Sequence, residues 1–171
     1  AGVASPAEEG LIASVESGWP QWRGGRRDGI SDEKGLLQRW PQGGPELLWK
    51  IDCLGQGWSS PIIVGENLYI TGDVDDALVI FAFDLDGTLQ WKVQADDWIR
   101  SRPYVNEHAV YFASVSGRIY RVSHRGELQW EKQISDHPIY ADLAGKDDRL
   151  LISDSHLMLT CCDGEGTSIW S

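Results

Sequence analysis

The stretch AFDLDGTLQW, residues 82–91, decides the fold because the chain repeats its pattern twice more. Aligned on the final tryptophan, the later copies are RVSHRGELQW (121–130) and CCDGEGTSIW (161–170), and an earlier tryptophan ends GPELLW (44–49). These tryptophans are 39 to 42 residues apart. Apolar pairs at 69–70, 111–112 and 151–152 keep the same register upstream of the last three. A period near forty residues is typical of repeat architectures.

Each repeat contains short segments that alternate between apolar and polar residues, which indicates β-strands. In the first repeat we expect strands at 59–64, 67–71, 77–84 and 88–94, with Gly- and Asp-rich turns at 65–66, 72–76 and 86–87. The second repeat reads RPYV, AVYFAS, RIYRVS, ELQWEKQI, and the third reads IYADLA, RLLISD, HLMLTCC, TSIW. Four strands per repeat predict an all-β fold, a β-propeller of four-stranded blades.

Other all-β folds fit less well. A β-sandwich needs no fixed forty-residue period. The Trp-Asp type of propeller repeat is disfavoured because the residues that follow the tryptophans are Lys50, Lys92, Glu131 and Ser171.

The chain divides into three parts on this prediction. Residues 1–18 form a flexible N-terminal segment, 19–45 a lead-in arm that packs on the propeller, and 46–171 the blades. Within the last part, 46–52 is the strand of a preceding or closing blade, followed by blades at 53–94, 95–134 and 135–171, the last one truncated. Propellers typically have four to eight blades, so three predict an open arc of a longer propeller. We expect the remaining blades to come from a longer chain or from association.

The pattern Ala82-x-Asp84-x-x-Gly87-x-x-x-Trp91 resembles the tryptophan-docking motif of the pyrroloquinoline quinone (PQQ) type repeat. The stretch WPQWRGGRRDGIS (19–31), with LWKIDCLGQGWSSPIIVGENLYITG (48–72), is similar to the start of PQQ-like propeller proteins. That group resembles the propeller lipoprotein of the outer-membrane β-barrel assembly machinery. The resemblance implies a periplasmic or secreted protein that serves as a binding or scaffolding platform, while a minority of such proteins are PQQ-dependent dehydrogenases.

The same resemblance implies a structural role for the repeated tryptophans and for the small residues near them. A buried tryptophan covers roughly 150–250 Å², so contacts between blades would dominate the packing. Arg121 occupies the place of Ala82 and Cys161, and this departure predicts looser docking at the second blade. The predicted docking residues are Trp49, Ala82, Gly87, Trp91, Gly126, Trp130, Cys161, Gly166 and Trp170.

The adjacent pair Cys161-Cys162 offers the sharpest enzymatic hypothesis, because quinoprotein alcohol dehydrogenases carry a disulfide between adjacent cysteines against the cofactor. Here the pair is in register with Ala82-Phe83, which favours a structural role. We therefore predict no catalytic residue and no cofactor, with PQQ and calcium expected only if the chain is a dehydrogenase fragment.

No metal site is predicted either. The stretch Asp73-Val74-Asp75-Asp76 resembles the opening of a calcium loop but lacks its glycine, so we interpret it as a hairpin turn. The histidines, at positions 108, 124, 137 and 156, are dispersed without metal-ligand spacing.

Charge excludes one class of partner. The formal net charge is −11, and binding to nucleic acid depends mainly on Lys and Arg. The arginines of WPQWRGGRRDG (19–29) stand alone in this acidic chain, so we expect Trp19 and Trp22 to pack the arm onto the blades. No apolar run approaches the length of a transmembrane segment.

The loops that connect one blade to the next offer the best candidate binding face, because they gather near the central channel of a propeller. These loops are 54–60, 95–102 and 135–142, and they combine aromatic faces with hydrogen-bonding groups. The alternative is that the side chains of these loops only pack and solvate the loops themselves. The candidate residues are Gln56, Trp58, Trp98, Arg100, Arg102, Tyr140 and Asp142.

The sequence thus predicts a non-catalytic platform that binds a protein or a small-molecule ligand. The alternative is the N-terminal fragment of a PQQ-dependent dehydrogenase, and a third option is the sensor part of a larger signalling chain.

Overall fold

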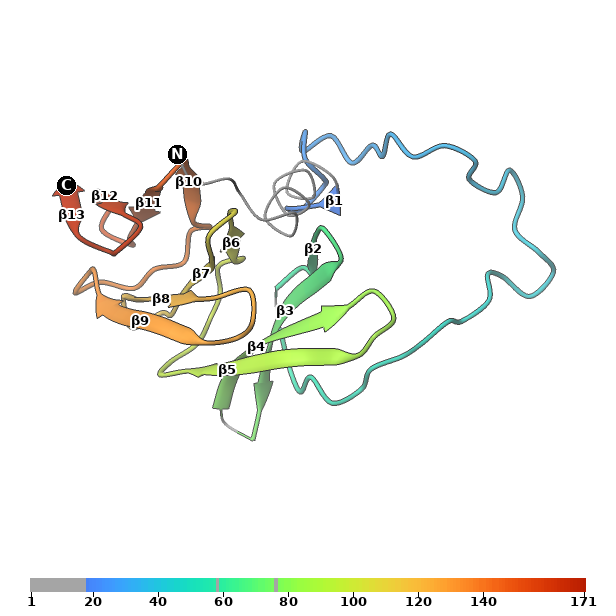
Figure 1. Ribbon diagram of the computed structural model, residues 1–171, viewed down its shortest axis with the longest axis horizontal. Coiled ribbons are helices and arrows are strands. Elements are labelled where there is room, and N and C mark those ends of the chain that lie inside the picture. Colours follow the sequence, from blue (N-terminus) through green and yellow to red (C-terminus); the bar gives the residue numbers. More distant parts are fainter. Residues whose placement is uncertain (1–17, 58, 76) are drawn as a thin grey trace, which may run out of the picture.

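The computed structural model describes residues 18–57, 59–75 and 77–171, which form three antiparallel sheets and no helix (Figure 1). The first sheet contains β1 (Gly18–Trp19), β2 (Ile62–Val64), β3 (Asn67–Val74), β4 (Ala77–Asp84) and β5 (Leu89–Ala95). The second contains β6 (Tyr104–Val105), β7 (Val110–Ala113), β8 (Arg118–Val122) and β9 (Leu128–Gln133). The third contains β10 (Ala144–Lys146), β11 (Arg149–Ser153), β12 (Leu159–Asp163) and β13 (Ser168–Trp170).

Each sheet is a meander in which consecutive strands pair. We call β2–β5 the first blade, β6–β9 the second and β10–β13 the third. Figure 1 shows β2, β6 and β10 toward a common centre and β5, β9 and β13 at the periphery. The sheets form an open arc, which confirms the predicted partial propeller.

The repeat positions occupy equivalent points in all three blades. In the first blade, Tyr69 pairs with Ala82, and Ala82 pairs with Trp91. The corresponding triplets are Tyr111, Arg121 and Trp130 in the second blade and Leu151, Cys161 and Trp170 in the third. The register shifts directly after Ala82, Arg121 and Cys161, so every blade has an irregularity just before the turn that leads into its last strand.

Two apolar cores lie between the blades, and β7 contributes to both because its side chains alternate. Val110 and Phe112 face the core shared with the first blade, where Phe112 stacks on Tyr120 at 4.7 Å. Tyr111 and Ala113 face the core shared with the third blade. Fully burying a large apolar side chain stabilises the fold by about 1.5–3 kcal/mol.

A third apolar cluster covers the outer face of the first blade. Phe81 and Phe83 from β4 are buried there, and Ile51 and Leu54 pack against them. The segment before the first blade therefore covers this face of the sheet. Among the described residues, no other blade packs against it.

The structure differs from the expected strands at several places. Residues 59–61 and 156–158 precede β2 and β12 instead of belonging to them. No strand forms over 46–52, because no described strand lies beside that segment to pair with it. Gly72 and Asp73 belong to β3 rather than to a turn, since they pair with Val79 and Leu78 of β4. In the third blade the first strand is 144–146, while Ile139 and Leu143, expected within a strand, are buried loop residues.

The lead-in arm packs only at its start. Trp19 in β1 pairs with Ile63 of β2, so the arm adds a short strand to the inner edge of the first blade. Trp22, which we expected to pack, is 65% exposed, since its ring lies beside Arg23 rather than against a blade. Residues 30–43 are exposed and run through the wide loop in Figure 1. Residues 1–17 of the predicted N-terminal segment lie outside the described residues.

Candidate functional site

Three of the four repeated tryptophans, Trp49, Trp91 and Trp130, each contact a turn in the blade that follows them. The indole N–H of Trp91 donates to the carbonyl of His124 at 3.0 Å, and that of Trp130 donates to the carbonyl of Gly164 at 3.2 Å. Trp49 makes the same contact with the carbonyl of Leu85 at 2.8 Å, although it is not in a strand. The three acceptors occupy equivalent positions in the turns 84–88, 123–127 and 163–167, which we call the docking turns.

Glycine is required in each docking turn for two reasons. Gly87, Gly126 and Gly166 have φ of +82°, +86° and +73°, a region that other residues rarely adopt. A Cβ atom on any of them would also lie within 3 Å of the tryptophan that docks there. Backbone conformation and close approach of the indole therefore select the same residue.

A side-chain oxygen at the start of each docking turn holds its shape. Asp84 Oδ1 accepts from the backbone N–H groups of Asp86 and Thr88, at 3.1 and 2.8 Å. Ser123 Oγ and Asp163 Oδ1 accept equivalent hydrogen bonds in the other two turns. These bonds explain why Asp or Ser stands at this position of the repeat.

Arg121 does not prevent docking at the second blade, where the Trp130 contact, at 3.2 Å, is the longest of the three. Its guanidinium lies over the ring of Tyr111, 5.9 Å from the centroid, and forms an ion pair with Glu165 of the third blade. The long side chain thus lies along the interface between the blades, while Trp91 and Trp130 still reach their carbonyl acceptors.

The third blade differs from the other two. Trp170 is 46% exposed, and no docking turn faces it among the described residues. Cys161 and Cys162 are free and buried, and Cys162 packs in the core between the second and third blades. Burial raises the pKa of the Cys162 thiol. Cys53 is exposed.

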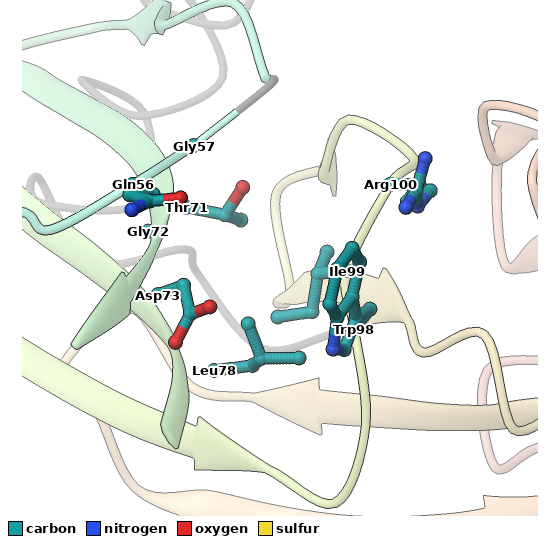
Figure 2. Close-up of a pocket in the computed structure, with 9 residues that line it drawn as sticks. All are labelled: Gln56, Gly57, Thr71, Gly72, Asp73, Leu78, Trp98, Ile99 and Arg100. Atoms are coloured by element: carbon teal, nitrogen blue, oxygen red, sulfur yellow. The ribbon is translucent and has the colours of Figure 1, made fainter. Parts of the chain in front are cut away.

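The predicted binding face divides into two groups. Gln56, Trp98 and Arg100 line one hollow together with residues from β3 and β4 (Figure 2). Trp58 lies outside the described residues. The hollow has an apolar wall of Leu78, Ile99 and the Trp98 ring. Asp73 also lines it, and the sequence interpretation missed this residue because we expected it in a turn.

Arg102 and Asp142 form the second group. Arg102 Nε lies 2.8 Å from Asp142 Oδ2, and the backbone N–H of Arg102 donates to Asp142 Oδ1 at 3.0 Å. Arg102 Nη1 also donates to the carbonyl of Pro20. This arginine therefore connects the second blade, the third blade and the lead-in arm. Tyr140 is 53% exposed, apart from the lining of the hollow.

Two histidines that are far apart in the sequence meet in the third blade. The rings of His137 and His156 stack with their centroids 3.6 Å apart. The sequence gives no signal for this contact, because one histidine is in a loop and the other in a hairpin. Within the described ranges no three His, Cys, Asp or Glu side chains form a group that could hold a metal ion.

Comparison with known proteins identifies the repeat. Residues 33–171 match the family described as outer membrane protein assembly factor BamB. No curated protein sequence matches the chain. No helix in the described residues is long and apolar enough to span a membrane.

Solved structures share the fold at low sequence identity. A europium-containing methanol dehydrogenase is 14% identical with a TM-score of 0.61, over 73% of this chain and 26% of that chain. The quinohemoprotein alcohol dehydrogenase ADHIIG from Pseudomonas putida HK5 is 21% identical with a TM-score of 0.58, over 71% and 21% of the two chains. BamB from Moraxella catarrhalis is 13% identical with a TM-score of 0.56, over 65% and 34%.

This chain therefore spans between 21% and 34% of the length of those proteins. The family match covers most of the chain, and the three blades share their fold with propellers of both kinds. The chain belongs to the BamB-like family of PQQ-repeat β-propellers.

Proposed function

We propose that this chain is part of a non-catalytic, extracytoplasmic propeller whose connecting loops bind a protein partner. The observation that carries the proposal is the hollow between loops 54–57 and 98–100, where Gln56, Trp98 and Arg100 meet. Trp98 is 48% exposed, and Arg100 lies over its ring, 4.7 Å from the centroid. Exposed tryptophan and arginine beside a hollow are the residues that protein interfaces favour. Membership of a family described as an outer membrane assembly factor supports an extracytoplasmic, non-enzymatic role.

Affinity isolation from the detergent-solubilised cell envelope tests this function. We would compare the wild-type protein with a Trp98→Ala/Arg100→Ala double variant and quantify the bound proteins by mass spectrometry. A partner that is enriched with the wild type and at least tenfold reduced with the double variant supports the proposal.

A Trp22→Ala/Arg23→Ala variant is the matched control, because the same two residue types also stack in the exposed lead-in arm. This variant should retain the partner. Equal retention of a partner by all three proteins would contradict a platform built on the connecting loops. The absence of any enriched protein would contradict it as well.

The alternative is a fragment of a PQQ-dependent dehydrogenase, which the two dehydrogenases among the structural neighbours favour. The described residues do not fit a complete site for PQQ and calcium. They contribute no cluster of three potential metal-ligating side chains, and Cys161 and Cys162 are free thiols. Dye-linked alcohol oxidation after incubation with PQQ and calcium would overturn the non-catalytic proposal.

A further inference from the structure

The hollow described above contains a carboxylate, that of Asp73. Asp73 lines it at the end of β3, where its backbone is fixed by two hydrogen bonds with Gln56. Its carboxylate takes part in no hydrogen bond or ion pair with the other described residues. The backbone of Asp73 is therefore fixed, and its carboxylate remains available to a ligand.

Apart from Arg100, the rest of the hollow is apolar or neutral. Figure 2 shows the side chains of Leu78 and Trp98 pointing toward the same space as the Asp73 carboxylate, with Ile99 beside Trp98. Gln56 and Thr71 lie along the opposite side. Thr71 Oγ1 is already occupied, since it donates to Ser59 Oγ at 2.7 Å. A ligand would thus meet a carboxylate at one end and three apolar side chains along one wall.

Arg100 is the other charged residue of the lining, and it lies at the far end of the hollow from Asp73, beyond Trp98 (Figure 2). Its guanidinium is held over the Trp98 ring. Arg100 therefore does not neutralise Asp73. The formal net charge of −11 adds a long-range field that attracts cations toward this chain.

We propose that this hollow accepts a lysine side chain of the protein partner. The ammonium group would bind the Asp73 carboxylate, and the four-carbon stem would pack along Leu78, Ile99 and Trp98. The proposal rests on the proposed platform function and specifies what the partner presents to it.

The chemistry of the hollow selects lysine among possible occupants. A lysine combines a compact charge with a flexible apolar stem, which matches one carboxylate beside an apolar wall. An arginine fork also pairs with a carboxylate through both oxygens, but its five N–H donors leave more groups to satisfy beside the apolar wall than the three of an ammonium group. An anionic lipid headgroup would be repelled by Asp73 and by the acidic chain as a whole.

Small probes test the proposal on the full chain without knowledge of the partner. We would titrate n-pentylammonium, n-pentanol and n-pentylguanidinium and follow the indole N–H of Trp98 by ¹H–¹⁵N NMR, with the resonance assigned from a Trp98→Phe variant. We expect n-pentylammonium to shift this resonance and to bind at least fivefold more tightly than either other probe. Its affinity should also fall as NaCl is raised, because a charge pair is involved.

Two carboxylates of the same hairpin provide a matched pair of variants. Asp73→Asn removes the charge in the hollow, and we expect it to weaken binding of n-pentylammonium about tenfold. Asp75→Asn removes an equal charge from an exposed turn residue that does not line the hollow, and it should change the affinity less than twofold. Asp73→Glu, which keeps the charge, should retain most of the binding and guards against an effect of misfolding.

The outcomes separate this proposal from the platform function. Equal binding of n-pentanol, no shift with any probe, or equal effects of Asp73→Asn and Asp75→Asn would overturn the lysine site. Envelope proteins retained by wild type and lost by Trp98→Ala/Arg100→Ala would still support the platform in that case. Binding of n-pentylammonium without any retained envelope protein would instead leave the lysine site intact and contradict the platform.

Discussion

Trp91 donates its indole N–H to the carbonyl of His124 at 3.0 Å, and this bond crosses from the first blade to the second. The same contact recurs between the next two blades and between Trp49 and the first blade. Because each bond joins only neighbours, the stability of the arc depends on contacts between successive blades.

Gly126→Ala tests the fit of the docking turn. A Cβ atom there would lie 2.4 Å from Trp91 Cβ, and the residue has φ of +86°. We expect the free energy of unfolding to fall by about 2–4 kcal/mol, from backbone strain and overpacking together. Urea denaturation measures the change. Gly25→Ala, at a site with no atom within 4 Å, should cost less than about 0.5 kcal/mol, and equal effects would contradict the assigned role.

The two tryptophans of the lead-in arm should behave differently. Trp19 is half-buried, and its ring packs on Gly24, whereas Trp22 is 65% exposed. Trp19→Ala should destabilise the chain by about 1–3 kcal/mol, a drop in Tm of roughly 2–4 °C for each kcal/mol. Trp22→Ala should leave Tm nearly unchanged. Differential scanning calorimetry of both variants decides the matter, and a larger effect at Trp22 would refute the packing described for the arm.

Leu157→Gly should stabilise the third blade. Leu157 has φ of +63° in the β11–β12 turn, where its N–H donates to the carbonyl of Asp154. The equivalent turn in the second blade places Gly117 there, with φ of +89° and the same bond to Ser114. Relief of the left-handed conformation, worth about 1–2 kcal/mol, should outweigh the backbone entropy that glycine loses on folding.

The urea midpoint is the measurement for this variant, and we expect a net gain of about 0.5–1 kcal/mol. Leu159→Gly provides the contrast because Leu159 is in β12, and glycine within a strand is unfavourable. A loss of stability in Leu157→Gly would show that the exposed leucine contributes a contact worth more than its strain.

Much of the fold is predictable because its signals are local. Strand alternation, turn glycines and the tryptophan register all lie within forty residues of one another, and the observed pairing of Tyr69, Ala82 and Trp91 follows them. The arc could be predicted from these signals alone.

The parts that sequence reasoning missed depend on which loops meet in space. Residues 46–52 carry a strand pattern, yet they form no strand because backbone pairing requires a neighbour. Asp73 enters the hollow because β3 pairs with β4 past the expected turn, and an isolated bridge places Gln56 of the upstream loop beside it. The predicted binding-face residues fall into two groups because of such loop contacts. Arg102 pairs with Asp142 of the next connecting loop instead of facing the hollow.

His124 should make stability depend on pH. Its Nε2–H donates to the carbonyl of Asn106 at 3.0 Å, and its Nδ1 is buried without a partner among the described residues. Burial lowers the pKa of this imidazole in the folded state. The unfolded chain, with a pKa of about 6.5, then binds a proton that the folded chain does not. Stability is therefore fully present above about pH 6.5 and falls as the pH drops below it.

Urea denaturation between pH 5.5 and 7.5 measures this dependence in the wild type and in His124→Gln. We expect the slope of unfolding free energy against pH to decrease in the variant, with a difference of at most one proton. An identical slope in the wild type and in His124→Gln would exclude His124 as the titrating group.

The docking contacts also fix a delay during synthesis, between each tryptophan and the carbonyl group that accepts its hydrogen bond. Each indole is followed by its acceptor carbonyl only 33 to 36 residues later in the chain. At roughly 5–20 residues per second, the ribosome leaves each of these rings without its acceptor for about 2–7 seconds. The nascent protein thus carries one unsatisfied indole after another, and the translation rate across each connecting stretch sets how long that ring is open to wrong partners.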